Sequence, residues 1–145
     1  MSTTNLCEDG GTLQHRSLGE GDWHQELAIR SLLARCTRSL DRGEDEAEFL
    51  DCWTDDAVFL VSGKSLRSRE ERRLLFHGVQ RPIRHMMTDS VITMDEDNGH
   101  HECNLLVFGD TDQGPYVRTH GFYSDHLLHT RSGWRLISRL VTKFA

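Results

Sequence analysis

The sequence predicts a single α+β domain in which three helices are followed by a cone-shaped, curved antiparallel sheet, an arrangement known as an α+β barrel. Three observations lead to this prediction. Apolar residues recur at helical spacing as far as residue 78, alternating β-prone runs fill the rest of the chain, and short turn sequences separate those runs. The 145 residues, 37% of them hydrophobic and 28% charged, are typical of one globular domain.

Three helices are expected in the first half of the chain. The first is predicted over residues 23–42, because Ile29, Leu33 and Leu40 fall on one face, and Gly43 is expected to end it. Asp45 is expected to cap a second helix that continues to residue 53, before a turn over 54–56 and a short strand over 57–61. The capping-box pattern Ser68-Arg69-Glu70-Glu71 predicts a third helix that ends at Gly78.

Four long strands are expected in the second half. They are predicted over residues 84–94, 101–108, 116–128 and 134–144. The segment 95–99 contains an Asn-Gly pair that suits a tight turn, and the segments 109–114 and 131–133 are also rich in turn residues. Strands joined in this way pair in antiparallel order, and the first helix is expected to lie across one curved face and enclose a pocket.

The charge and the N-terminal residues exclude several classes of protein. The net charge is −6 with histidine neutral, and the 17 Lys and Arg residues are scattered, which argues against nucleic acid or an anionic membrane as partner. No apolar run approaches the roughly 20 residues needed to span a bilayer. Residues 1–21 are too polar for a secretory signal, so we expect a disordered tail over 1–21, a folded domain over 22–145 and a cytoplasmic location.

The cysteine and histidine patterns do not predict a metal site. Four cysteines stand singly, without the short spacing of a zinc ribbon or a disulfide framework, and we expect reduced thiols that mostly fill the core: Cys7, Cys36, Cys52 and Cys103. The run His100-His101-Glu102-Cys103 has the residue types of a metal site, but consecutive strand residues face opposite ways. We therefore expect no bound metal.

Several short motifs occur in an order that resembles one known family. They are Ser39-Leu40-Asp41, the run WTDDAVF at 53–59, Arg84-His85, the run GFYSD at 121–125 and Gly133-Trp134-Arg135. Together they resemble the SnoaL-like branch of the nuclear transport factor 2-like superfamily, over about residues 23–144. This resemblance implies an α+β barrel with a deep apolar pocket for a small molecule, usually in a homodimer. Its enzymes include scytalone dehydratase, a dehydrochlorinase, polyketide cyclases and ketosteroid isomerases, all without organic cofactors.

The resemblance also implies an acid–base pair. The dehydratases and the dehydrochlorinase pair an aspartate near the end of the first helix with a histidine on the strand after the third, and these positions match Asp41 and His85. A carboxylate that binds one ring nitrogen fixes the tautomer and leaves the other nitrogen free as a base. Each residue also has an alternative interpretation without a catalytic role. His85 can be an ordinary core or surface histidine, and Asp41 can be a solvated residue at the end of the helix, at the flank of its apolar stripe.

Further residues are expected to contact a substrate. Arg139 aligns with an active-site arginine of the dehydrochlorinase, and Tyr123 can offer its hydroxyl to a substrate oxygen, although an outward arginine and a packing tyrosine are the alternatives. The other predicted substrate contacts are Met87, Asn104 and Phe108. The chain departs from scytalone dehydratase, because Leu40 stands where that enzyme has a tyrosine beside the aspartate and its second strand histidine has no counterpart here.

The sequence therefore predicts a cofactor-independent lyase or isomerase, of the dehydratase or cyclase type, that acts on a small, mostly apolar, cyclic or polyketide-like molecule. The alternative is a non-catalytic ligand-binding or subunit-type protein of the same fold. Small subunits of ring-hydroxylating dioxygenases are of this second kind, and the strand with Arg84-His85 resembles theirs.

Overall fold

The structure, a computed structural model, describes residues 20–144. Most of the predicted tail over residues 1–21 lies outside this range, as does Cys7. Three helices and six strands follow in the order α1 (Glu20–Arg42), α2 (Glu46–Asp51), β1 (Trp53–Val61), β2 (Lys64–Leu66), α3 (Arg69–Gly78), β3 (Ile83–Asp95), β4 (Asn98–Thr111), β5 (Gly114–Thr130) and β6 (Gly133–Lys143).

The six strands form one curved sheet, and this confirms the α+β class with a cone-shaped sheet on three helices. The strand order is β2-β1-β6-β5-β4-β3. The strands β3 to β6 pair in antiparallel order as predicted, whereas β1 pairs with β6 in parallel. Within residues 20–144 the sheet does not close, because β2 and β3 remain its two edges.

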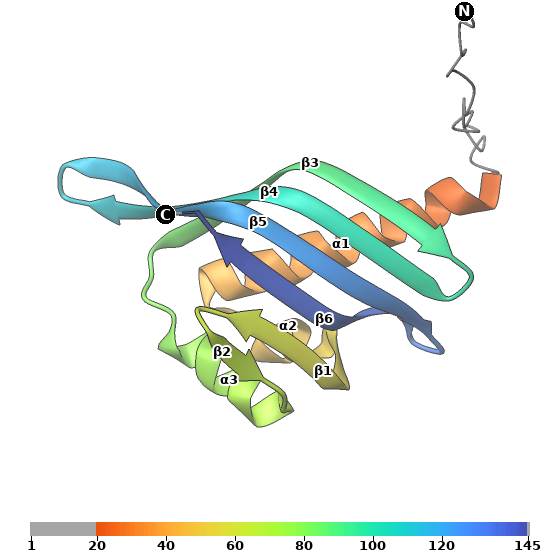
Figure 1. Cartoon of the computed structure of the whole chain (residues 1–145). Coiled ribbons are helices and arrows are strands. Elements are labelled where there is room, and N and C mark those ends of the chain that lie inside the picture. The colour runs from red at the N-terminus through yellow and green to blue at the C-terminus, as the bar shows by residue number, and fades with distance from the viewer. Residues whose placement is uncertain (1–19, 145) are drawn as a thin grey trace, which may run out of the picture.

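The helix α1 covers one face of the sheet. Figure 1 shows it running behind the long strands, while α2 and α3 lie beside β1 and β2, and no helix of residues 20–144 covers the front face. The side of α1 that meets the sheet carries the apolar residues Ile29, Leu32, Leu33 and Cys36, each at most 2% exposed. This is the face that the helical spacing predicts.

The end of α1 is fixed to the segment before β3 by one arginine. Gly43 ends the helix with φ 67°, a left-handed conformation that suits glycine. The Arg81 guanidinium donates hydrogen bonds to the carbonyl oxygens of Leu40 at 2.9 and 3.1 Å and of Phe76 at 2.8 Å. It thereby satisfies carbonyl groups at the C-terminal ends of both α1 and α3. This contact holds the last turn of α1 against the start of β3.

Two predicted boundaries are wrong, each for a reason of tertiary structure. The second helix ends at Asp51, and β1 begins at Trp53 and includes the predicted turn over 54–56. The buried Arg72 side chain of α3 holds this segment extended by donating to the carbonyl groups of Thr54, Asp55 and Ala57. The short strand β2 was not predicted.

The turn predicted within residues 95–99 lies at 96–97, but the Asn98-Gly99 pair that was expected to form it belongs to β4. Gly99 packs under α1, where an added Cβ would come within 3.2 Å of Ile29 and Trp134. The glycine therefore serves close packing between helix and sheet, not turn geometry.

Candidate functional site

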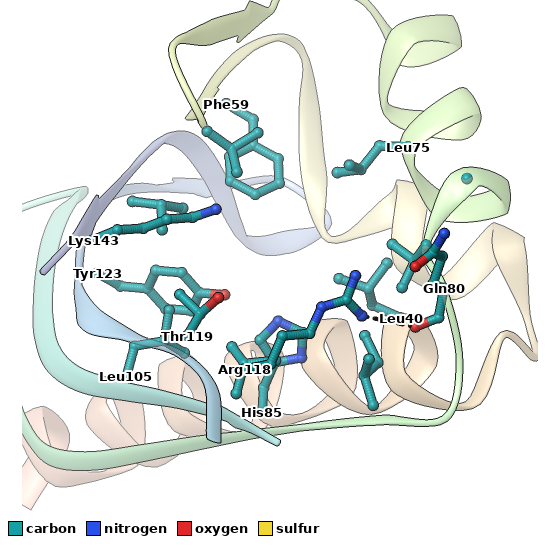
Figure 2. Close-up of a pocket in the computed structure, with 16 residues that line it drawn as sticks. Leu40, Phe59, Leu75, Gln80, His85, Leu105, Arg118, Thr119, Tyr123 and Lys143 are labelled. Carbon is teal, nitrogen blue, oxygen red and sulfur yellow. Dashed lines mark hydrogen bonds between the residues drawn. The ribbon is translucent and has the colours of Figure 1, made fainter. Parts of the chain in front are cut away.

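A pocket opens between the end of α1, α3 and the concave side of the sheet. It has a volume of about 530 Å³. Its walls are mostly apolar, with contributions from Leu40, Phe59, Val61, Leu105, Val107 and Val141. Figure 2 shows polar side chains reaching into the same space from several strands, among them His85 on β3, Tyr123 on β5 and Lys143 at the end of β6. Such a pocket suits an apolar molecule that a few polar groups orient.

The structure brings Asp41 and His85 together at the pocket wall. The Nδ1 atom of His85 lies 2.5 Å from Oδ1 of Asp41, and the backbone N–H of His85 donates to the other carboxylate oxygen at 2.9 Å. The side chains of His85 and Asp41 are only 11% and 8% exposed. Two contacts from one carboxylate fix both the ring and the strand that carries it.

This geometry determines which nitrogen of His85 is available. A carboxylate only accepts hydrogen bonds, so Nδ1 must carry the hydrogen in the neutral ring. Within residues 20–144 no hydrogen-bond partner is found for Nε2, and the ring lines the pocket. The unprotonated nitrogen is thus the one free to take a proton from a molecule in the pocket.

Tyr123 presents a hydroxyl group to the same pocket. Its side chain lines the pocket and no hydrogen bond to the hydroxyl is found in the described part of the chain. Burial raises the pKa of this phenol well above its usual range, so the group stays protonated. A neutral, unpartnered hydroxyl can donate to an oxygen of a bound molecule, which is the role that the sequence suggested for Tyr123.

Arg139 lies behind Tyr123 and is not part of the pocket wall. It is 3% exposed, and its guanidinium carbon lies 4.0 Å from the centre of the Tyr123 ring. Its Nε and Nη2 atoms donate to the two carboxylate oxygens of Asp125 at 2.7 and 2.8 Å. Burial alone would lower the pKa of Arg139, but the charge and hydrogen bonds of Asp125 raise it above the ordinary value. Arg139 therefore supports the tyrosine ring from the core side.

Asp125 also belongs to a second aspartate–histidine pair that the sequence analysis missed. Its Oδ2 accepts from His101 Nδ1 at 2.8 Å, and His101 Nε2 lies 3.0 Å from the Ser90 hydroxyl. The side chains of His101 and Asp125 are 1% and 0% exposed. The prediction that His100 and His101 face opposite sides is confirmed, because His100 is exposed. Strand parity shared with Cys103 and Leu105 was the available signal for a buried His101.

The remaining predicted substrate contacts lie elsewhere. Asn104 and Phe108 have the opposite parity on β4 from the pocket residues Leu105 and Val107, and Asn104 donates to Asp89 at 2.8 Å. Met87 is half-buried beside Thr37, whose hydroxyl lies 3.9 Å from its sulfur atom. None of the three lines the pocket, and their roles as substrate contacts stay predictions.

The described residues contain neither a group of side chains suited to a metal ion nor a membrane-spanning helix. Among residues 20–144, no three His, Cys, Asp or Glu side chains are grouped so that they could hold a metal ion. No helix in the same range is long and apolar enough to cross a membrane. Cys36, Cys52 and Cys103 are buried and unbridged.

The fold and the pocket define a class of protein, the α+β cones of the nuclear transport factor 2-like type. Within this class, residues 22–140 match the model of the SnoaL-like domain, and the chain belongs to this family. No curated protein matches the chain.

Solved structures agree with this assignment. A substituted form of a protein of unknown function from Mycobacterium tuberculosis is 26% identical, with a TM-score of 0.77 over 84% of this chain and 77% of that chain. A protein from Novosphingobium aromaticivorans, described as nuclear transport factor 2-like with a cystatin-like fold, is 21% identical, with a TM-score of 0.77 over 84% and 83%. A candidate scytalone dehydratase from the same organism is 14% identical, with a TM-score of 0.72 over 85% and 86%. At these last two identities the likeness shows the fold alone.

Proposed function

We propose that the protein is a cofactor-independent lyase or isomerase in which His85 is the general base and Asp41 orients it. The observation that carries this proposal is the pairing of the two side chains, with Nδ1 bound to the carboxylate and Nε2 free at an apolar pocket wall. General-base catalysis of this kind typically contributes ~10² to 10⁴ in rate.

The mechanism begins at a carbon that a neighbouring carbonyl group makes acidic. His85 Nε2 takes the proton from that carbon, and Asp41 stabilises the imidazolium that forms. The Tyr123 hydroxyl donates a hydrogen bond to the carbonyl oxygen as it becomes an enolate. In an elimination, a hydroxyl group on the next carbon then leaves as water with the proton from His85. In an isomerisation, His85 returns the proton to a different carbon.

The proposed substrate is a small, mostly apolar molecule, cyclic or polyketide-like. The apolar walls and the volume of about 530 Å³ support this choice, because pockets of this size bury most of the surface of a drug-sized molecule. The small molecule is the only ligand that the proposal requires.

An absorbance assay tests the proposal for both reaction types. Cyclic β-hydroxy ketones lose water to give conjugated enones, and β,γ-unsaturated ketones isomerise to conjugated enones, so both products absorb in the near ultraviolet. A panel of each is incubated with the protein and with the His85→Gln and Asp41→Asn variants. We expect turnover of at least one compound that both variants lose while they keep the native circular dichroism spectrum. Turnover that survives in His85→Gln would contradict the proposal.

The face of the sheet that α1 does not cover supports a homodimer. It also supports the second candidate function, in which the protein is a non-catalytic subunit that binds a larger partner. Leu60 and Leu140 are cross-strand partners on this face, and the exposed Val91 and Met86 of β3 share it. These apolar side chains are exposed beside polar residues such as Glu102 on the same face, and they support an interaction site there. We propose that a second copy in the cytoplasm covers it. Light scattering should give twice 16.7 kDa for a homodimer, whereas stable co-purification with a larger oxygenase-type subunit would favour the second candidate.

A further inference from the structure

Two positively charged side chains line the pocket without a charged partner. Arg118 of β5 donates from Nη1 to the backbone oxygen of Gln80 at 3.1 Å, and Lys143 of β6 donates from Nζ to the Ser62 hydroxyl at 2.8 Å. Both partners are neutral. Within residues 20–144 neither cation forms an ion pair with a carboxylate, and each keeps further N–H groups that can donate.

The position of these two cations sets them apart, because a cation without an ion pair also occurs outside the pocket among the described residues, for example Arg84, which donates to a backbone oxygen. The chain as a whole has a net charge of −6. Among the described residues no Asp or Glu lines the pocket, and the nearby Asp41 contacts His85 instead. The pocket is therefore a positive site in a negative chain, and apolar walls strengthen the field of such charges on a ligand.

The two cations lie at the mouth of the pocket. Arg118 and Lys143 are exposed, whereas the apolar residues Phe59 and Leu105 of the walls are buried. Figure 2 shows the Lys143 chain extending into the pocket from the β6 side and the Arg118 chain reaching towards Gln80. A ligand that fills the pocket with an apolar body would leave a group at the mouth within reach of these two side chains.

We infer that the pocket binds an amphiphilic anion, with an apolar ring system held by the walls and one carboxylate or equivalent acidic group held at the mouth by Arg118 and Lys143. The guanidinium of Arg118 presents a fork of donors that matches a carboxylate, and the ammonium of Lys143 adds a second charge. This inference rests on the proposed function, since it names the substrate class of the same site. It also gives the ligand one orientation, with its acidic group outward and its body towards His85 and Tyr123.

A pair of fluorescent probes tests the charge preference directly. Anilinonaphthalenesulfonate and phenylnaphthylamine share an apolar ring system, and only the first carries an anionic group. We expect the native protein to bind the anionic probe more tightly. Arg118→Gln and Lys143→Gln should each weaken its binding roughly 3- to 5-fold, and the double variant roughly 10- to 20-fold. The two single variants and the double variant should all leave the affinity for the neutral probe unchanged.

A matched control removes a cation of the same kind outside the pocket. Arg131 is exposed in the turn between β5 and β6, at the other end of these strands from Lys143 and Arg118, so Arg131→Gln should alter neither affinity. Raising the salt concentration should weaken only the anionic probe. Val141→Trp, which fills the pocket, should abolish binding of both probes while the protein keeps a cooperative thermal transition.

The outcomes distinguish the inference about anion binding from the proposed catalytic role of His85. Equal affinity for the two probes, or an anionic preference that Arg118→Gln and Lys143→Gln leave intact, would overturn the inference and leave the role of His85 standing. Failure of both probes to bind would overturn it as well. Selective anion binding without any turnover dependent on His85 would instead support the inference and contradict the proposed enzyme.

Discussion

Two aspartate–histidine pairs lie in this protein and differ in what surrounds them. Asp41 and His85 join the end of α1 to β3 at the wall of the pocket. Asp125 and His101 are direct cross-strand partners on β5 and β4, and both are sealed in the interior. In each pair a carboxylate oxygen contacts Nδ1 of the imidazole, at 2.5 Å in the first and 2.8 Å in the second.

The difference lies in the second nitrogen and in the charge. Nε2 of His101 is taken by the Ser90 hydroxyl, and Arg139 neutralises Asp125 through two hydrogen bonds. Nε2 of His85 faces the pocket instead, and the Asp41 carboxylate has no arginine partner among the described residues. The same two residue types thus make a candidate base where one nitrogen stays free, and a structural connection where every polar atom is satisfied.

The largest expected effect comes from comparing the two histidines. His85→Gln should lower turnover ~10² to 10⁴-fold, because it removes the base. His101→Gln should leave turnover per folded molecule within a few-fold, because its ring does not reach the pocket. The measurement is kcat/KM for a compound found in the absorbance assay. Equal losses in the two variants would show that the pairs do not have separate roles.

Substitutions of the two aspartates should affect stability in the opposite order, with the larger loss in the buried pair. Asp125→Asn leaves the buried Arg139 without its counter-charge and should lower the free energy of unfolding by about 3 to 5 kcal/mol. Asp41→Asn keeps an oxygen that accepts from the His85 backbone and should cost about 1 kcal/mol. Urea denaturation measures both. Replacing the ion pair as a unit, in the double variant Asp125→Leu with Arg139→Met, should recover part of the loss.

Tyr123→Phe should separate the hydroxyl from the ring. The ring packs against Arg139 and stays in place, so the free energy of unfolding should change by less than about 0.5 kcal/mol. Turnover should fall roughly 10²-fold, because a donor to the developing oxyanion is lost. Steady-state kinetics and urea denaturation of one variant give both numbers. A stability loss without a kinetic effect would assign the hydroxyl to packing.

The fourth prediction, with the smallest expected effect, concerns the pH dependence of stability. Lowering the pH should remove the contribution of the buried Asp125 carboxylate to the free energy of unfolding. Burial alone would raise the pKa of Asp125, but Arg139 and His101 outweigh it and hold the pKa below the ordinary value of 3.8. A carboxyl group whose pKa is lowered in the folded state stabilises the protein at pH values above its pKa in the unfolded chain. This contribution is lost as the pH falls through the pKa of the folded state. The free energy of unfolding should therefore decrease more between pH 6 and a pH below 4 in the native protein than in the Asp125→Asn variant.

Local chemistry made the helices predictable. The Asp45 cap and the Ser68–Glu71 capping box are both confirmed, because each depends on residues within one turn. The start of β1 was not predictable in this way, since Arg72 from a later helix holds that segment extended. The parallel pairing of β1 with β6 likewise joins distant parts of the chain.

The candidate site also contains residues that the sequence predicted and residues whose roles depend on contacts between distant parts of the chain. Asp41 and His85 were reached through the resemblance of motifs to a family, although helical spacing alone left Asp41 at the flank of the apolar stripe. The network around Asp125 depends on the register that pairs His101 with Asp125 across β4 and β5, and on the pairing of Asp125 with Arg139 across β5 and β6. Turns at the far ends of these strands set those registers, so the sequence alone could not show that Arg139 lies behind Tyr123.

The tautomer of His85 tests the central claim most directly. A long-range ¹H–¹⁵N correlation spectrum of the labelled protein distinguishes the protonated from the unprotonated ring nitrogen. We predict that the neutral ring carries its hydrogen on Nδ1 with Nε2 free, and that Asp41→Asn weakens this preference while leaving the signals of His101 unchanged. A neutral His85 protonated on Nε2 would mean that the carboxylate does not orient the ring, and would contradict its assignment as the base.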